Sequence, residues 1–210
     1  MKSVSIKSKH ILKIIDIDAK TEIYGSNQDW YLKRRQRRCG CGPATVTNII
    51  YYIQKKHIEN DHNTGLTKQN CLNLMNEIWR FVTPGFRGIP STALLGKGID
   101  KYLQEYKLDI RLDYLNIPKN KQFRPDLDTV ARFLHYALDQ DIPVAFLNLD
   151  NGKVAELEAY HWVTAISLDY CLDENVAYLT IIDGGDEIKI DLHRWLATTK
   201  SGGGFVSFTL

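Results

Sequence analysis

Residues 36–53 have the sequence QRRCGCGPATVTNIIYYI, and this stretch decides how the chain is expected to fold. Pro43 stands where a helix would begin, and proline is favoured in a first helical turn because the N–H it lacks has no partner there. Apolar residues then recur at the spacing of one helix face, from Ala44 to Ile53. The pattern predicts a buried helix with Cys41 at its start.

Cys41 is the sharpest candidate for chemistry in this stretch. Peptide dipoles and free N–H groups at the start of a helix stabilise a thiolate, which is the reactive form of cysteine. The alternative is a small buried residue that packs the start of the helix. Cys39 could form a disulfide or redox pair with Cys41. We favour Cys41 as the reactive thiol because Gly42 and Pro43 follow it.

The rest of the chain predicts helices in its first two thirds and strands in its last third. Helices are expected at 69–82, 92–106 and 124–140, strands at 11–17 and 107–115, and a polar loop at 57–68. Further strands are expected at 142–149, 159–170, 176–183, 187–192 and 205–210, with a short helix at 193–200. This order predicts an α+β fold in a single domain, residues 1–210. A mainly helical lobe (about 1–140) would meet a lobe of antiparallel β-sheet (about 141–210) at a cleft.

Composition and charge exclude several classes of protein. The 210 residues are 44% hydrophobic and 25% charged, which is enough apolar material for a core and excludes a disordered chain. The net charge of +2 is too small to indicate a protein that binds nucleic acids or membrane surfaces. No apolar run is long enough for a secretion signal or a membrane span. A cytoplasmic protein with reduced thiols is therefore expected.

Two further patterns bear on partners. The basic run KRRQRR at 33–38 is either a solvated edge or a surface beside the cleft that recruits an acidic segment. One aromatic pair adjoins it, which is too little for base stacking, so nucleic acid is not an expected partner. The cysteines and histidines lack metal-ligand spacing, and no phosphate-binding glycine motif occurs. No metal and no cofactor are expected.

His161 and Asp183 lie far downstream of Cys41 and gain meaning together with it. A histidine in a strand is more often structural, and an acid before a glycine turn often bonds its own backbone. In the order Cys, His, Asp, however, they match a nucleophilic triad. The thiolate would attack a carbonyl, the imidazole would take and return a proton, and the carboxylate would hold the imidazole's tautomer.

These motifs, QRRCGCGPATVTNIIYYI followed by HWVTAISL and IIDGG, resemble the C39-like (bacteriocin-processing-peptidase-like) branch of the papain-like cysteine peptidases. The matching stretches are about 28–52 and 159–186. The resemblance implies a papain-like fold with Cys41 as nucleophile, His161 as general base and acid, and Asp183 as the orienting group. It thereby predicts a cysteine-dependent hydrolase that cleaves an amide bond of a peptide or protein through a thioester.

The resemblance also implies an oxyanion hole, made by the Cys41 N–H and a glutamine side chain. Gln36 is preferred for this role over Gln28, because only a short turn separates Gln36 from the helix. Two alternatives to the peptidase stay open: an amide hydrolase or acyltransferase of the same fold with a non-peptide substrate, and an inactive papain-like binding module.

Substrate-binding candidates lie beside the predicted nucleophile and base and in one loop. Gly40 and Trp162 are chain neighbours of the triad residues. Gly85 and Phe86 belong to TPGFRGIPST at 83–92, a stretch rich in glycine and proline that is typical of an irregular loop lining a groove.

Overall fold

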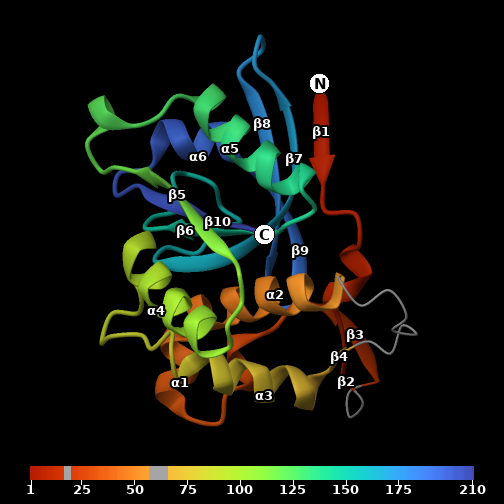
Figure 1. Cartoon of the computed structure of the whole chain (residues 1–210). Helices are drawn as coiled ribbons and strands as arrows, with labels where there is room; N and C mark the ends of the chain where they lie inside the picture. Colours follow the sequence, from red (N-terminus) through yellow and green to blue (C-terminus); the bar gives the residue numbers. More distant parts are fainter. Residues whose placement is uncertain (17–19, 57–65) are drawn as a thin grey trace.

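The computed structural model describes residues 1–16, 20–56 and 66–210, and it is an α+β protein built on one large antiparallel sheet (Figure 1). The sheet has the order β5-β10-β6-β7-β8-β9, and β1 pairs with β7. Its strands are β1 (Lys2–Ser5), β5 (Arg111–Ile117), β6 (Val144–Asn148), β7 (His161–Cys171), β8 (Val176–Asp183), β9 (Asp186–Asp191) and β10 (Gly203–Thr209). A smaller sheet of order β3-β2-β4 consists of β2 (Lys13–Asp16), β3 (Thr21–Tyr24) and β4 (Leu66–Thr67).

Helices cover both faces of the large sheet (Figure 1). The α-helices in the described part of the chain are α1 (Arg34–Cys39), α2 (Cys41–Lys56), α3 (Lys68–Trp79), α4 (Thr92–Glu105), α5 (Leu127–Asp139) and α6 (Leu192–Thr198). Short 3-10 helices are η1 (Lys9–Leu12), η2 (Gln28–Trp30) and η3 (Lys121–Phe123). Four α-helices are capped at their N-terminus by a side-chain oxygen that accepts a hydrogen bond from a backbone N–H in the first turn. The capping residues are Thr67, Ser91, Asp126 and Asp191.

The alternation of side chains along β6 divides the core into two layers. Phe146 points to the face covered by α5 and α6, where its ring centroid lies 4.7 Å from that of Trp195. Leu147 points to the opposite face and packs in the same cluster as Ile50 of α2. Every residue of β6 is buried, as expected for a strand with helices on both sides. Helix α2 is therefore fixed against the sheet that carries the downstream motifs.

A third cluster fixes the segment that precedes α1. Tyr31 is 1% exposed, and its hydroxyl donates to the carbonyl of Met75 on α3 at 3.0 Å. Cys71 lies in the same cluster, and burial raises the pKa of its thiol to about 12. Cys71 is thus a core residue with an unreactive thiol.

The α+β class is confirmed, but the large sheet does not follow the predicted division near residue 140. Strands β1 and β5 come from the first part of the chain and join the large sheet. Strand β1 has only four residues with one buried side chain, too few for a periodic signal. The predicted loop at 57–68 lies mostly outside the described residues, and positions 66–67 form β4. No helix in the described part is long and apolar enough to cross a bilayer.

Candidate active site

The junction of α1 and α2 places Cys41 at the first turn of a buried helix. The N–H of Ala44 donates to the carbonyl of Gly40 at 2.9 Å, so the helical hydrogen bonds begin directly after α1. A Cβ on Gly40 would lie 2.4 Å from the carbonyl oxygen of Gln36 and 2.7 Å from the ring of Tyr31. Glycine is therefore needed for this close passage, which leaves Cys41 half-buried at the start of α2.

The sheet places His161 and Asp183 at neighbouring strand ends. His161 is the first residue of β7 and Asp183 is the last of β8, and the two strands pair antiparallel. The turn into β9 is made by Gly184 and Gly185, whose φ values of 59° and 105° suit a two-residue hairpin. The carbonyl of His161 also accepts a hydrogen bond of 3.3 Å from Nδ2 of Asn148. The backbone positions of both residues are thus fixed by the sheet.

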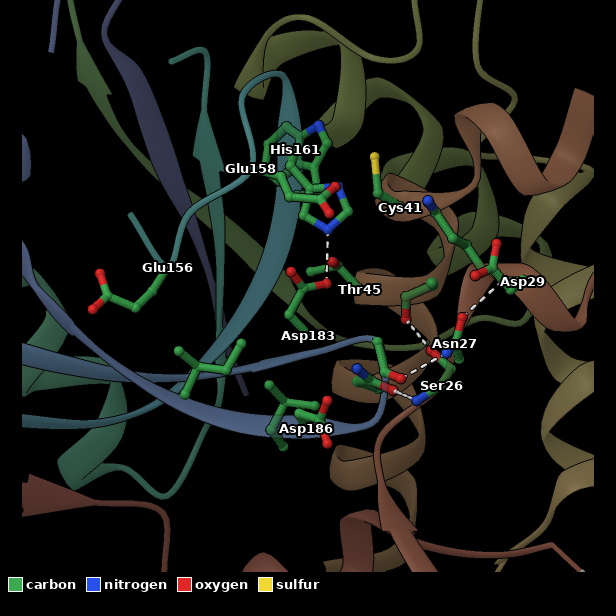
Figure 2. Close-up of a pocket in the computed structure, with 17 residues that line it drawn as sticks. Ser26, Asn27, Asp29, Cys41, Thr45, Glu156, Glu158, His161, Asp183 and Asp186 are labelled. Atoms are coloured by element: carbon green, nitrogen blue, oxygen red, sulfur yellow. Dashed lines mark hydrogen bonds and ion pairs between the residues drawn. The ribbon is translucent and has the colours of Figure 1, made fainter. Parts of the chain in front are cut away.

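The imidazole of His161 contacts Asp183 and lies beside Cys41. Its Nε2 lies 2.7 Å from Oδ1 of Asp183, and the residue is only 8% exposed. Burial alone would lower the pKa of His161, but the hydrogen bond with Asp183 and the interaction with the neighbouring Cys41 raise it to about 10. An imidazolium at neutral pH therefore stands between a carboxylate and a sulfur atom, and Figure 2 shows the Cys41 sulfur beside the ring.

The three side chains border a pocket of about 300 Å³ (Figure 2). Trp162 forms part of its wall and is fixed by a hydrogen bond of 2.7 Å from its Nε1 to the carbonyl of Ile89. Gln28 of η2 also lines the pocket, and its amide oxygen is buried without a partner among the described residues. A polar side chain left in this state in the wall of a pocket fits a group that meets a ligand.

Two asparagines connect the two walls of the pocket. Oδ1 of Asn48 on α2 accepts from the N–H of Ser26 at 2.7 Å, and its Nδ2 donates to Oγ1 of Thr164 on β7 at 3.0 Å. Nδ2 of Asn27 donates to the carbonyl of Gly184 at 2.6 Å. These bonds hold the segment before η2 against both the cysteine helix and the strand ends.

Gln36 does not lie where the oxyanion prediction requires it. The basic run forms helix α1, which directs Gln36 towards α3, where its Nε2 donates to Oδ1 of Asn76 at 3.3 Å. Gln36 does not line the pocket, whereas Gln28, the alternative from the sequence, does. The oxyanion role stays a prediction, but it passes from Gln36 to Gln28.

Among the four predicted substrate-binding residues, Trp162 lines the pocket and the other three do not. Gly40 is buried at the helix junction, and Gly85 is bridged to Gly88 in a small turn. Phe86 is 95% exposed, and its carbonyl contacts the sulfur of Cys39 at 4.0 Å. The loop therefore packs beside α1, outside the pocket.

Two arginines of the basic run have structural partners. Arg35 donates to the carbonyl of Pro84 at 3.0 Å, and Arg37 donates to the carbonyls of Tyr31 and Leu32 at 2.8 and 2.9 Å. Part of the basic run therefore has a structural role, because these two arginines donate hydrogen bonds to backbone carbonyls, and the run is not only a solvated edge.

The acidic residues of the pocket are not among the candidates that the sequence indicates. Asp29, Glu156, Glu158 and Asp186 line it together with Cys41, His161 and Asp183. A usable signal exists for two of them, because Glu158 precedes His161 by three positions and Asp186 follows Asp183 by three. Each therefore lies one short turn from a triad residue.

Comparison of the chain with protein-family models and with curated proteins gives no match. The interpretation of the site therefore depends on its geometry. Within the described residues, no three His, Cys, Asp or Glu side chains form a group that could hold a metal ion. The chemistry that these residues can support is that of a thiol, an imidazole and a carboxylate.

Proposed function

We propose that this protein is a cysteine-dependent hydrolase, a peptidase of papain-like fold, that cleaves an amide bond through a thioester on Cys41. The observation that carries the proposal is one imidazole, His161, which is paired with Asp183 at 2.7 Å and lies beside the sulfur of Cys41 in the same pocket (Figure 2). A cysteine at the start of a buried helix, facing a histidine and an acid at strand ends, supports the papain-like assignment.

In the first half of the reaction, the Cys41 sulfur adds to the carbonyl carbon of the substrate. The negative charge that develops on the carbonyl oxygen requires hydrogen-bond donors, and the Cys41 N–H and the Gln28 side chain are the candidates. The carbon–nitrogen bond then breaks, and the departing amine takes the proton held by His161. The acyl group remains on Cys41 as a thioester.

In the second half, water replaces the amine. His161 takes a proton from the water, which adds to the thioester carbonyl, and the carbon–sulfur bond breaks to release a carboxylic acid. Asp183 keeps the imidazole oriented and stabilises its charged form throughout. The enzyme returns to its starting state with the proton again on His161.

The proposal is tested by incubating the protein with a complex peptide mixture and identifying new termini by mass spectrometry. Cleavage is expected with the wild type and is expected to disappear in Cys41→Ala. Cys39→Ala is the matched control, since that thiol is also half-buried but contacts the loop and not His161. Product masses separate hydrolysis from transfer to an added amine.

A second readout is labelling of the reduced protein with an epoxide inhibitor of cysteine peptidases. Modification is expected at Cys41 and not at Cys71, whose thiol is buried. A Cys41 that reacts no faster than Cys39, in a protein that cleaves no peptide, would leave an inactive binding module as the better description.

A further inference from the structure

Apart from His161, every charged side chain that lines the pocket is acidic. Besides Asp183, four carboxylates line the pocket, from Asp29, Glu156, Glu158 and Asp186, and no lysine or arginine lines it in the described structure. Figure 2 shows these carboxylates distributed around the triad. They belong to three separate segments: η2, the loop before β7, and the start of β9.

Within the described residues, these carboxylates have few neighbouring cations to offset their charge. Across residues 1–16, 20–56 and 66–210, none of the four pairs with a lysine or arginine. Glu156 also borders a neighbouring groove that holds Lys153 and Arg194, which offset part of its charge. The negative potential of the pocket therefore comes mainly from Asp29, Glu158 and Asp186.

The basic helix α1 does not reverse this potential. None of its arginines lines the pocket, and Arg35 and Arg37 donate to backbone carbonyls outside it. The His161 imidazolium does not reverse it either, because its charge is opposed by the Asp183 carboxylate at 2.7 Å. The net field that a substrate meets is that of the wall.

The arrangement suits an organic cation better than a metal ion. The acids stand apart on three segments and form no metal-holding group among the described residues. Separated charges around a pocket of about 300 Å³, which is at the lower end of the range for small-molecule sites, attract a single ammonium or guanidinium group.

We propose that the substrate carries a positive charge, an ammonium or guanidinium group, within about one residue of the amide bond that is cleaved. The inference rests on the proposed function for the identity of the site, while the charge preference follows from Asp29, Glu158 and Asp186. The cation has two chemical sources: a lysine or arginine side chain, or a free α-amino group next to the bond.

The first experiment measures the field at Cys41 without any amide substrate. In a Cys39→Ser background, Cys41 is modified by 2-aminoethyl methanethiosulfonate, which is cationic, or by its anionic 2-sulfonatoethyl analogue. In either case the sulfur forms a mixed disulfide and methanesulfinate leaves. Rates are followed by peptide mapping and divided by the rates with a small free thiol.

We expect the cationic reagent to be favoured about tenfold or more at about 20 mM salt, and much less at about 500 mM. Glu158→Gln and Asp186→Asn should each reduce this ratio about threefold. Glu174→Gln is the matched control, since Glu174 lies in the β7–β8 turn at the opposite end of the strands, and it should leave the ratio unchanged. A wild-type ratio near one, or a preference for the anion, overturns the inference, as does a ratio that stays unchanged when Glu158→Gln and Asp186→Asn are combined in one double variant.

The second experiment uses matched peptide amides that differ at the residue next to the scissile bond. Lysine is compared with norleucine, its neutral counterpart, and with glutamate, each with a free or an acetylated α-amine. We expect kcat/KM to be at least about tenfold higher with a cation present. Loss of the preference on acetylation assigns it to the α-amine, and its persistence with lysine assigns it to the side chain.

The two experiments separate the two proposals. If no amide is cleaved but the labelling ratio favours the cation, the proposed hydrolase fails and the charge preference of the pocket stands. If amides are cleaved without regard to charge and the labelling ratio is flat, the hydrolase stands and the cationic substrate is excluded.

Discussion

The two walls of the pocket differ in how the chain builds them. The helix wall comes from one stretch, in which Gln28 and Cys41 lie 13 positions apart, and its shape depends on the tight passage at Gly40. The sheet wall carries His161 and Asp183 on paired strands, so backbone hydrogen bonds fix their distance. Each wall is local in sequence, whereas their alignment depends on the packing of α2 against the sheet and on a few side-chain bonds between the walls. The substitutions below remove a functional group from the helix wall, then one from the sheet wall, and then a hydrogen-bonding side chain that joins the two walls.

Removal of the nucleophile from the helix wall should have the largest effect. Cys41→Ser is expected to lower kcat/KM by about 10⁴-fold or more, because the hydroxyl is a far weaker nucleophile in a site built for sulfur. Steady-state hydrolysis of the best peptide found in the library is the measurement. Cys39→Ser should retain activity within about threefold, and equal losses in both variants would contradict the assignment of Cys41.

Removal of the acid from the sheet wall should have the next largest effect. Asp183→Ala is expected to lower kcat by about 10³-fold, because His161 loses the carboxylate that orients it and stabilises its charge. Asp173→Ala, in the exposed turn at the far end of β7 and β8, is the control. An increase in KM alone, with kcat intact, would exclude the orienting role.

The two candidate oxyanion donors are one glutamine that lines the pocket, Gln28, and one that lies outside it, Gln36. Gln28→Ala is expected to lower kcat by about 10²-fold, as the loss of one oxyanion donor does in comparable sites. Gln36→Ala, which removes a bond to an exposed asparagine, should change kcat less than threefold. The same peptide assay decides between them, and the reverse order of effects would return the role to Gln36.

Loosening of the connection between the walls should mainly affect stability. Asn48→Ala is expected to lower the free energy of unfolding by about 2 kcal/mol, because the Ser26 N–H and the Thr164 hydroxyl lose their partner in a buried site. Urea denaturation measures this change. Asn73→Ala, on the exposed surface of α3, should stay within about 0.5 kcal/mol of the wild type.

The smallest expected effect is on the pH dependence of kcat/KM. The raised pKa of His161, about 10, means that the imidazolium persists at neutral pH and that kcat/KM falls as pH rises through that value. Since Asp183 is one cause of the raised pKa, Asp183→Asn should move the descending limb to lower pH by about one unit. Asp173→Asn should leave the limb in place, and an unmoved limb in both variants would remove Asp183 as the cause.

The sequence predicts each wall better than the way they join. Periodicity and the Gly–Pro start locate α2, and alternation with glycine turns locates β7 to β9, because these signals depend on near neighbours. The preference for Gln36 over Gln28 was wrong about the pocket, since distance along the chain does not reveal that α1 turns one glutamine towards α3. The links from Asn27 and Asn48 span 157 and 116 positions, and no local pattern indicates such pairs.

The shared edge of β7 has a practical consequence for handling the protein. Strand β1 covers Ser167 to Tyr170, while β6 covers the half of β7 that begins with His161. A protease that clipped the chain just after Ser5 would free this cover and leave four residues of β7 as an open edge. Open edges recruit other chains, so nicked material is expected to aggregate while the clip itself lies well away from the pocket. Loss of activity in aged samples should therefore be checked first by intact mass.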